Sequence, residues 1–228
     1  MLSPLQRYCQ GNHEAVWDEL YALGELDDEQ VPAAKAVADE TMKRARHNVE
    51  IIVGRLEKLG YEFLFPRQEV FVPPAATIQD DLTRIEDLVG LLPLSITAWY
   101  EQVGSIYLAG DHRTLNCFRR ELRVAGTWQW IETDALSVDP LLRSLEYFDS
   151  LEELTETVLF PITEVEGGSY EGVDVPNGRI DGIYKGKGET FVQYLRRSFK
   201  WGGFPGWRNY PEKPTKELDY LKADLLPI

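Results

Sequence analysis

The 228-residue sequence is poor in the side chains that most often build metal and redox sites, with only two cysteines and three histidines. Cys9 and Cys117 lie far apart and match no metal-ligand spacing, so we expect two reduced thiols. His13, His47 and His112 have no partner at metal-ligand spacing either. These absences predict a protein without a metal site or a cofactor.

Long apolar runs are also missing. No stretch approaches the roughly 18 continuous apolar residues of a membrane-spanning helix. Residues 1–8 lack the basic and apolar regions of a secretory signal. We therefore expect a cytoplasmic protein with no membrane partner.

Basic residues are scarce relative to acidic ones, 24 against 38, and the formal net charge is −14. Such a field repels phosphate backbones and favours encounter with basic partners. The charge therefore argues against a nucleic-acid ligand. It indicates the sign of a partner's charge but not whether a partner exists.

The sequence shows no nucleophile with its base, no metal cage and no positioned pair of carboxylates. Residues 182–188 (GIYKGKG) lack the spacing of a phosphate-binding loop and a Ser or Thr after the lysine, so they predict a basic turn. We therefore expect no enzyme. An enzyme whose carboxylates converge only in the folded chain stays open, and a concave pocket with two or more buried carboxylates would favour it.

The N-terminal third is strongly helical in pattern. Residues 4–21 predict a helix interrupted at Gly11-Asn12, and residues 31–59 predict a long helix that Gly60 ends. The apolar stripe of the long helix can pair with the first helix as a hairpin, which we favour, or with a second copy in a dimeric regulatory or structural module. Residues 73–77 predict a linker, which divides the chain into residues 1–77 and 78–228, either as two separate parts or packed as one unit.

The rest of the chain mixes helices with strands that do not alternate, which predicts an α+β class. Helices are expected at 80–89, 93–103, 150–156 and 215–226. Extended segments are expected at 61–72, 105–109, 127–132, 145–148 and 158–162, and a hairpin is expected from 172–175 and 179–184.

The segment of residues 190–207 (TFVQYLRRSFKWGGFPGW) combines an amphipathic helix, a glycine break and three aromatic residues. Thr190 is the expected N-cap, and Gly202 or Gly203 is expected to end the helix in the left-handed conformation. The cations are expected on a solvated helix face, which we favour, or at a site for an anion or an acidic partner. The large rings either pack at the core edge, which we favour, or form a partner-binding patch together with the cations. The candidate patch residues are Arg196, Arg197, Trp201 and Trp207.

Two short motifs resemble those of the SUKH superfamily. Residues 90–104 (GLLPLSITAWYEQVG) resemble its Leu-Pro turn and following helix, with Pro93, Trp99 and Gly104 at the structural positions. Residues 191–199 with Gly202 and Gly203 are similar to the closing helix of bacterial members. The chain departs from many members by having Val103 rather than Asn before Gly104, and by its long helical N-terminus.

The resemblance implies a mixed or antiparallel sheet flanked by helices, here extended by the N-terminal helical hairpin. It implies a non-enzymatic protein-binding domain, most often an immunity protein that neutralises a toxin of a contact-dependent or polymorphic toxin system. Such toxins are frequently basic nucleases, which agrees with the acidic charge. No catalytic residues carry over, and we expect any partner to use the acidic surface away from residues 190–207.

Overall fold

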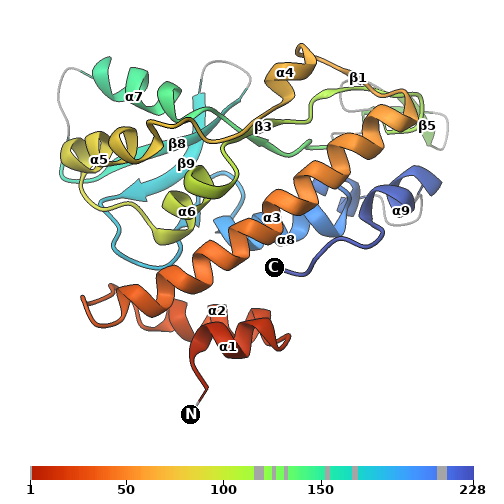
Figure 1. The fold of residues 1–228 in the computed structure, drawn as a ribbon. Helices are drawn as coiled ribbons and strands as arrows, with labels where there is room; N and C mark the ends of the chain where they lie inside the picture. The colour runs from red at the N-terminus through yellow and green to blue at the C-terminus, as the bar shows by residue number, and fades with distance from the viewer. Residues whose placement is uncertain are drawn as a thin grey trace.

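The computed structural model describes residues 2–115, 121–124, 127–130, 133–151, 155–165, 169–209 and 215–228, and Cys117 lies outside them. Helices and antiparallel strand pairs make up an α+β fold, as the sequence predicts (Figure 1). The α-helices are α1 (Pro4–Cys9), α2 (His13–Ala22), α3 (Val31–Leu59), α4 (Arg67–Val70), α5 (Ile78–Val89), α6 (Leu94–Gln102), α7 (Leu141–Asp149), α8 (Phe191–Lys200) and α9 (Lys216–Lys222), with a 3-10 helix η1 (Pro205–Asn209). None of these helices is long and apolar enough to cross a membrane.

The strands are short except for one hairpin. They are β1 (Glu62–Phe63), β2 (Phe71–Val72), β3 (Ser105–Tyr107), β4 (Gly110–Asp111), β5 (Glu121–Val124), β6 (Thr127–Trp130), β7 (Ser137–Val138), β8 (Val158–Val165), β9 (Ser169–Val175), β10 (Ile183–Tyr184) and β11 (Glu189–Thr190). All pairings between them are antiparallel, and β3 lies between β2 and β7.

Helix α3 has the predicted bounds, and its 29 residues run diagonally across the view of Figure 1. Gly60 ends it in the left-handed conformation with φ +74°, which glycine adopts without a steric cost. Its apolar stripe is fully buried: Ala38, Met42, Ala45, Val49, Ile52 and Leu56 are 0% exposed. Helices α1, α6 and α9 pack against α3, so elements of the same chain cover the stripe. A second copy would have to displace them to reach it.

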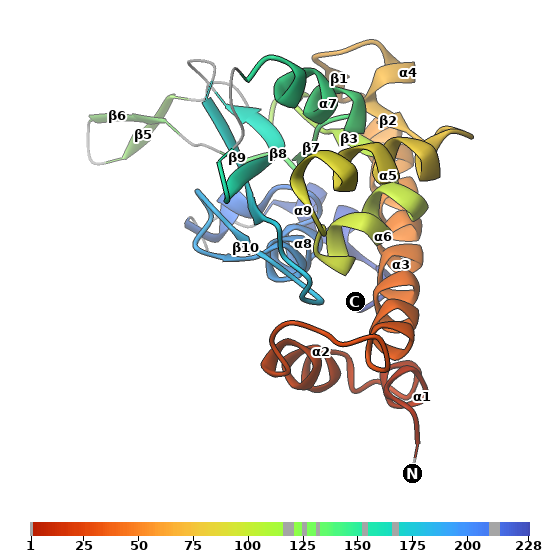
Figure 2. The ribbon, with the colours of Figure 1, turned by 90° about the vertical axis from the view of Figure 1, so that its left-hand side faces the viewer.

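One hydrophobic core includes residues from Tyr8 to Ile228, and residues 1–77 and 78–228 both contribute to it. Figure 2 shows α3 on one side of the molecule and the β8–β9 hairpin on the other, with β3 and β7 between them. Strand β7 continues toward this hairpin, because the N–H of Asp139 donates to the carbonyl of Ile162 at 2.8 Å. Strands β2, β3, β7, β8 and β9 thus form the layer on which the candidate site is built.

The structure contradicts two strand predictions. Residues 145–148 are helical rather than extended, because Leu141, Leu145 and Phe148 share one buried helix face in α7. The expected hairpin of 172–175 with 179–184 does not form either. Strand β9 pairs along its length with β8, and residues 179–180 accept hydrogen bonds from the start of α6 instead.

Smaller differences concern element ends. The second extended piece of 61–72 contains the turn of helix α4, and the last helix stops at Lys222 rather than 226. The residues after α9 run along α3, where Asn48 exchanges two hydrogen bonds of 2.7 and 2.8 Å with the backbone of Leu226. Ser150 ends α7, and the rest of the helix expected at 150–156 falls largely on residues 152–154, outside the described residues. Residues 131–132 of the expected strand 127–132 also lie outside them.

Candidate functional site

The motif of residues 90–104 is held by contacts between its own residues and with the neighbouring backbone. Pro93 is the N-cap of α6, and the indole Nε1 of Trp99 donates to the carbonyl of Gly104 at 2.7 Å. Gly104 has φ +93°, and a Cβ there would overlap the backbone carbonyl of Val72. All three motif positions therefore act through packing and backbone geometry.

The second motif is built in the same way. Thr190 and Gln193 form a capping box at the start of α8. Gly202 and Gly203 follow the helix with φ +62° and +94°, and a Cβ on Gly203 would lie 2.7 Å from Leu108 Cδ1. This helix end is thus held against the core.

Asp181 joins the two motif helices, a role that no sequence pattern indicates. Its side chain is 2% exposed. Oδ1 accepts from Ser95 Oγ of α6 at 2.7 Å, and Oδ2 accepts from the N–H of Val192 at the start of α8 at 3.1 Å. Burial raises the pKa of the Asp181 carboxyl to about 6, against the hydrogen bonds, which lower it.

The four candidate patch residues are held within the chain. Arg196 donates to the carbonyls of Ile228 at 2.8 Å and His13 at 3.3 Å, and Arg197 forms an ion pair of 2.6 Å with Glu189. Trp207 is 5% exposed, and Trp201 packs partly buried against the core. The two rings thus lie at the edge of the core, and the two arginines are held by groups of the chain rather than on a fully solvated face.

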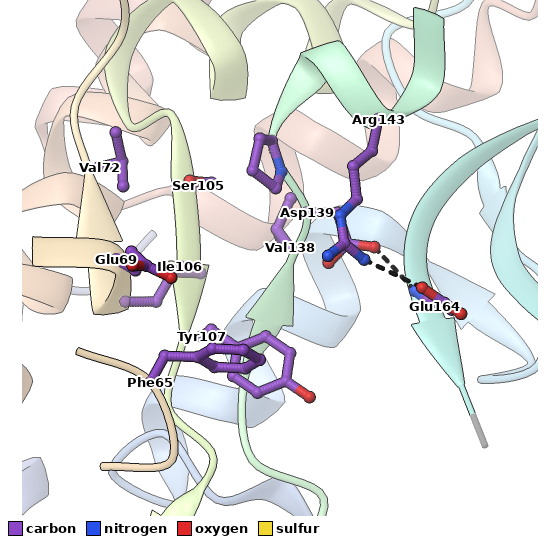
Figure 3. A pocket seen from close by; sticks show the side chains of 11 residues that line it. Phe65, Glu69, Val72, Ser105, Ile106, Tyr107, Val138, Asp139, Arg143 and Glu164 are labelled. Carbon is purple, nitrogen blue, oxygen red and sulfur yellow. Dashed lines mark hydrogen bonds and ion pairs between the residues drawn. The ribbon is translucent and has the colours of Figure 1, made fainter. Parts of the chain in front are cut away.

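A hollow in the described surface lies elsewhere, where β3, β7 and β8 approach α4 and α7 (Figure 3). Its volume is about 420 Å³, within the range of about 300–1,000 Å³ common for ligand pockets. The buried side chains of Ile106 and Val138 contribute apolar surface to its lining. We call this hollow the acidic pocket, because Glu69, Asp139 and Glu164 line it and Arg143 is the one cation among its described lining residues.

Asp139 is the most firmly held of these groups. It is 6% exposed, its carbonyl accepts from the hydroxyl of Tyr100 at 3.2 Å, and its Oδ2 accepts from the N–H of Glu164 at 2.9 Å. Oδ1 has no hydrogen-bond partner among the described residues. Burial raises the pKa of the Asp139 carboxyl, while Arg143 nearby lowers it. Asp139 is therefore a fixed carboxylate with one unused oxygen.

Arg143 and Glu164 form an ion pair of 2.9 Å across the gap between α7 and β8 (Figure 3). Their side chains are 49% and 42% exposed, and pairs of this exposure contribute about 0–1 kcal/mol. Both residues also line a neighbouring hollow of about 550 Å³, together with Glu146, Tyr147, Ser150 and Tyr170. The ion pair thus separates the two hollows, and breaking it requires little free energy.

An aromatic pair borders the acidic pocket below the ion pair in the view of Figure 3. The rings of Phe65 and Tyr107 pack edge to face with centroids 4.6 Å apart. Burial raises the pKa of the Tyr107 hydroxyl, and the nearby charge of Asp139 raises it further. Phe65 and Val72 in the lining are 37% and 41% exposed, and the adjacent Leu64 is 54% exposed. The rim therefore combines acidic groups with exposed apolar surface.

The pocket does not meet the criterion for a carboxylate enzyme, because only Asp139 of its three carboxylates is buried. Among the described residues no cluster of three or more His, Cys, Asp or Glu could hold a metal ion. His13 contacts Arg44 and His112 contacts Thr114, while His47 is exposed on α3. The acidic pocket offers fixed hydrogen-bond acceptors, aromatic surface and apolar surface, all of which can bind a ligand.

No family model matches the chain, and no curated protein or solved structure matches it either.

Proposed function

We propose that the chain is a non-enzymatic, cytoplasmic protein-binding domain that recognises a basic partner through the acidic pocket and its rim. The observation that carries this proposal is the pocket itself, in which an apolar and aromatic lining is combined with three carboxylates and one guanidinium. Protein interfaces depend on a few well-packed aromatic and charged anchors, and this hollow supplies both kinds.

The net charge of the whole chain also supports a basic partner. A net charge of −14 attracts a basic protein from a distance, and complementary potentials raise association rates more than affinity. The local excess of carboxylates at the pocket then gives the approaching surface a defined place to dock.

The resemblance to the SUKH superfamily makes the proposal more specific. The partner would be a basic toxin, typically a nuclease, and the chain would be its immunity protein. Neutralisation would follow from steric occlusion of the toxin's active site.

Co-expression with the product of the neighbouring toxin-like gene tests the proposal. We expect this chain to restore growth and to co-purify with a catalytically inactive form of the toxin. Cells that carry the empty vector are the control for growth. If growth is not restored and the two proteins do not co-purify, the pairing is wrong.

A further inference from the structure

The acidic pocket has a more specific ligand than a basic surface in general. Resting on the proposed function, we propose that it binds one guanidinium group, the side chain of an arginine of the partner, and that Arg143 occupies the adjoining wall until that arginine arrives.

The unused acceptors of the pocket favour a guanidinium. Asp139 Oδ1, the carboxylate of Glu69 and the hydroxyl of Tyr107 have no hydrogen-bond partner among the described residues. A guanidinium presents five N–H donors in a planar fork and is more weakly hydrated than an ammonium group. It can therefore pair with Asp139 Oδ1 and keep donors for a further acceptor of the pocket, at a lower cost of dehydration than a lysine.

Asp139 is positioned before any ligand arrives. Its backbone N–H, its carbonyl and its Oδ2 are all hydrogen-bonded, to Ile162, Tyr100 and Glu164. The carboxylate therefore loses little freedom on binding, and such preorganisation raises affinity. A cation at Oδ1 would also compensate the buried charge, which has no ion-pair partner among the described residues.

The remaining walls suit a flat, delocalised cation. Phe65 and Tyr107 supply aromatic surface, on which guanidinium groups stack and to which cations are attracted. Ile106 and Val138 supply apolar surface for the methylene groups of an arginine stem.

Arg143 already shows how such a group can sit at this wall, since its guanidinium pairs with Glu164. An ion pair this exposed biases the equilibrium by about fivefold at most, so an incoming arginine can displace it. Displacement would free Glu164 for the ligand and join the pocket to the neighbouring hollow that Arg143 and Glu164 also line. Arg143 is therefore a competitor of the ligand and not one of its contacts.

N-acetyl-L-arginine amide is the probe for this pocket, and N-acetyl-L-citrulline amide is its uncharged isostere. Titration of the full ¹⁵N-labelled chain should shift the amide signals of Tyr107, Asp139 and Glu164 in a saturable way with the arginine probe. The citrulline probe should bind about tenfold more weakly or worse, the value of one charged hydrogen bond. Equal binding of both probes, equal binding of N-acetyl-L-lysine amide, or no shift at these residues would overturn the proposal.

Two pocket variants and a matched control sharpen the test. Asp139→Asn keeps an oxygen for the N–H of Glu164 and should weaken arginine binding about tenfold or more. Arg143→Gln removes the competitor and should tighten binding several-fold, up to about fivefold. Asp28→Asn changes the net charge equally at an exposed site outside the pocket lining and should leave binding unchanged. Weaker binding by Arg143→Gln would show that Arg143 is a ligand contact and would contradict the proposal.

The same variants separate this inference from the proposed function. If the toxin-like partner is neutralised equally by the wild-type chain and by Asp139→Asn, the arginine site is wrong and the binding function stands. If the partner is not bound at all, the function fails, and the probe titration still decides whether the pocket takes a guanidinium. Should Asp139→Asn fail to fold, Arg143→Gln carries the decision, because its exposed side chain contributes little to stability.

Discussion

Asp181→Asn should destabilise the protein more at pH 4.5 than at pH 7.5. The folded-state pKa of Asp181 is about 6, above the ordinary value of 3.8, so the folded chain holds this proton more tightly than the unfolded chain. The stabilisation is fully present below pH 3.8 and is lost as the pH rises through 6. Asparagine cannot titrate, so the variant lacks this dependence.

The magnitude follows from the shift. With 1.36 kcal/mol per pKa unit, ionising Asp181 costs the folded state about 1 kcal/mol at pH 4.5 and about 3 kcal/mol at pH 7.5. The difference in unfolding free energy between wild type and variant should therefore shrink by about 2 kcal/mol across this range. A constant loss of about 1–3 kcal/mol is added, because the amide nitrogen of asparagine cannot accept the hydrogen bond that an Asp181 oxygen now accepts.

Urea denaturation at both pH values measures this difference. Asp28→Asn serves as the control, since it makes the same change in charge at an exposed position. A difference that stays constant, or that grows toward pH 7.5, would mean that the donors around Asp181 favour its ionised form, and the reasoning from burial would be refuted.

Three further substitutions, one of them with a matched control, test the packing of the fold. Gly104→Ala should lower the unfolding free energy by more than about 2 kcal/mol, because its φ is +93° and a Cβ overlaps a backbone carbonyl. Its control is Gly54→Ala within α3, where nothing lies within 4 Å of the added Cβ and the unfolding free energy should rise by roughly 0.5–1 kcal/mol. Equal effects of the two substitutions in urea denaturation would contradict this. Trp207→Ala should cost about 3–5 kcal/mol of stability and leave partner affinity unchanged, and the reverse result would restore the aromatic patch as a site. Asn48→Ala should cost about 2–3 kcal/mol and increase hydrogen exchange at Leu226, and protection that persists there would show that the two hydrogen bonds do not hold the tail.

Local sequence signals were sufficient for the elements that are determined locally. The alternating spacing of apolar residues and the stop at Gly60 gave both ends of α3, and the cap at Thr190 gave the start of α8. In both helices the spacing of the apolar residues and the capping residue predict the same helix boundary, so tertiary packing does not override the local signal.

The failures have a tertiary cause. Residues 145–148 are too few to show a helical period by themselves, and the face of α7 becomes clear only when Leu141 is included. The turn residues after Val175 are good hairpin formers, yet β9 takes β8 as its partner, and the following residues meet the unpaired N–H groups of α6. Neither competing partner can be identified from the segment alone.

The acidic pocket could not be predicted for the same reason. Its residues come from four separate parts of the chain, around Glu69, Tyr107, Asp139 and Glu164, and each is ordinary in its own segment. The one local sign was Asp139, a carboxylate between the end of strand β7 and the Pro140 that caps a helix. The overall acidic charge predicted the sign of the partner but not the place where it binds.

The most direct measurement of the central claim is growth rescue and co-purification with the toxin-like partner for two charge reversals. Glu69→Lys places a cation at the rim of the acidic pocket, and Asp28→Lys makes the same change in net charge at an exposed position outside the pocket lining. We expect Glu69→Lys to lose rescue and co-purification, while Asp28→Lys keeps both. Equal behaviour of the two variants would contradict the claim that the partner docks at this pocket.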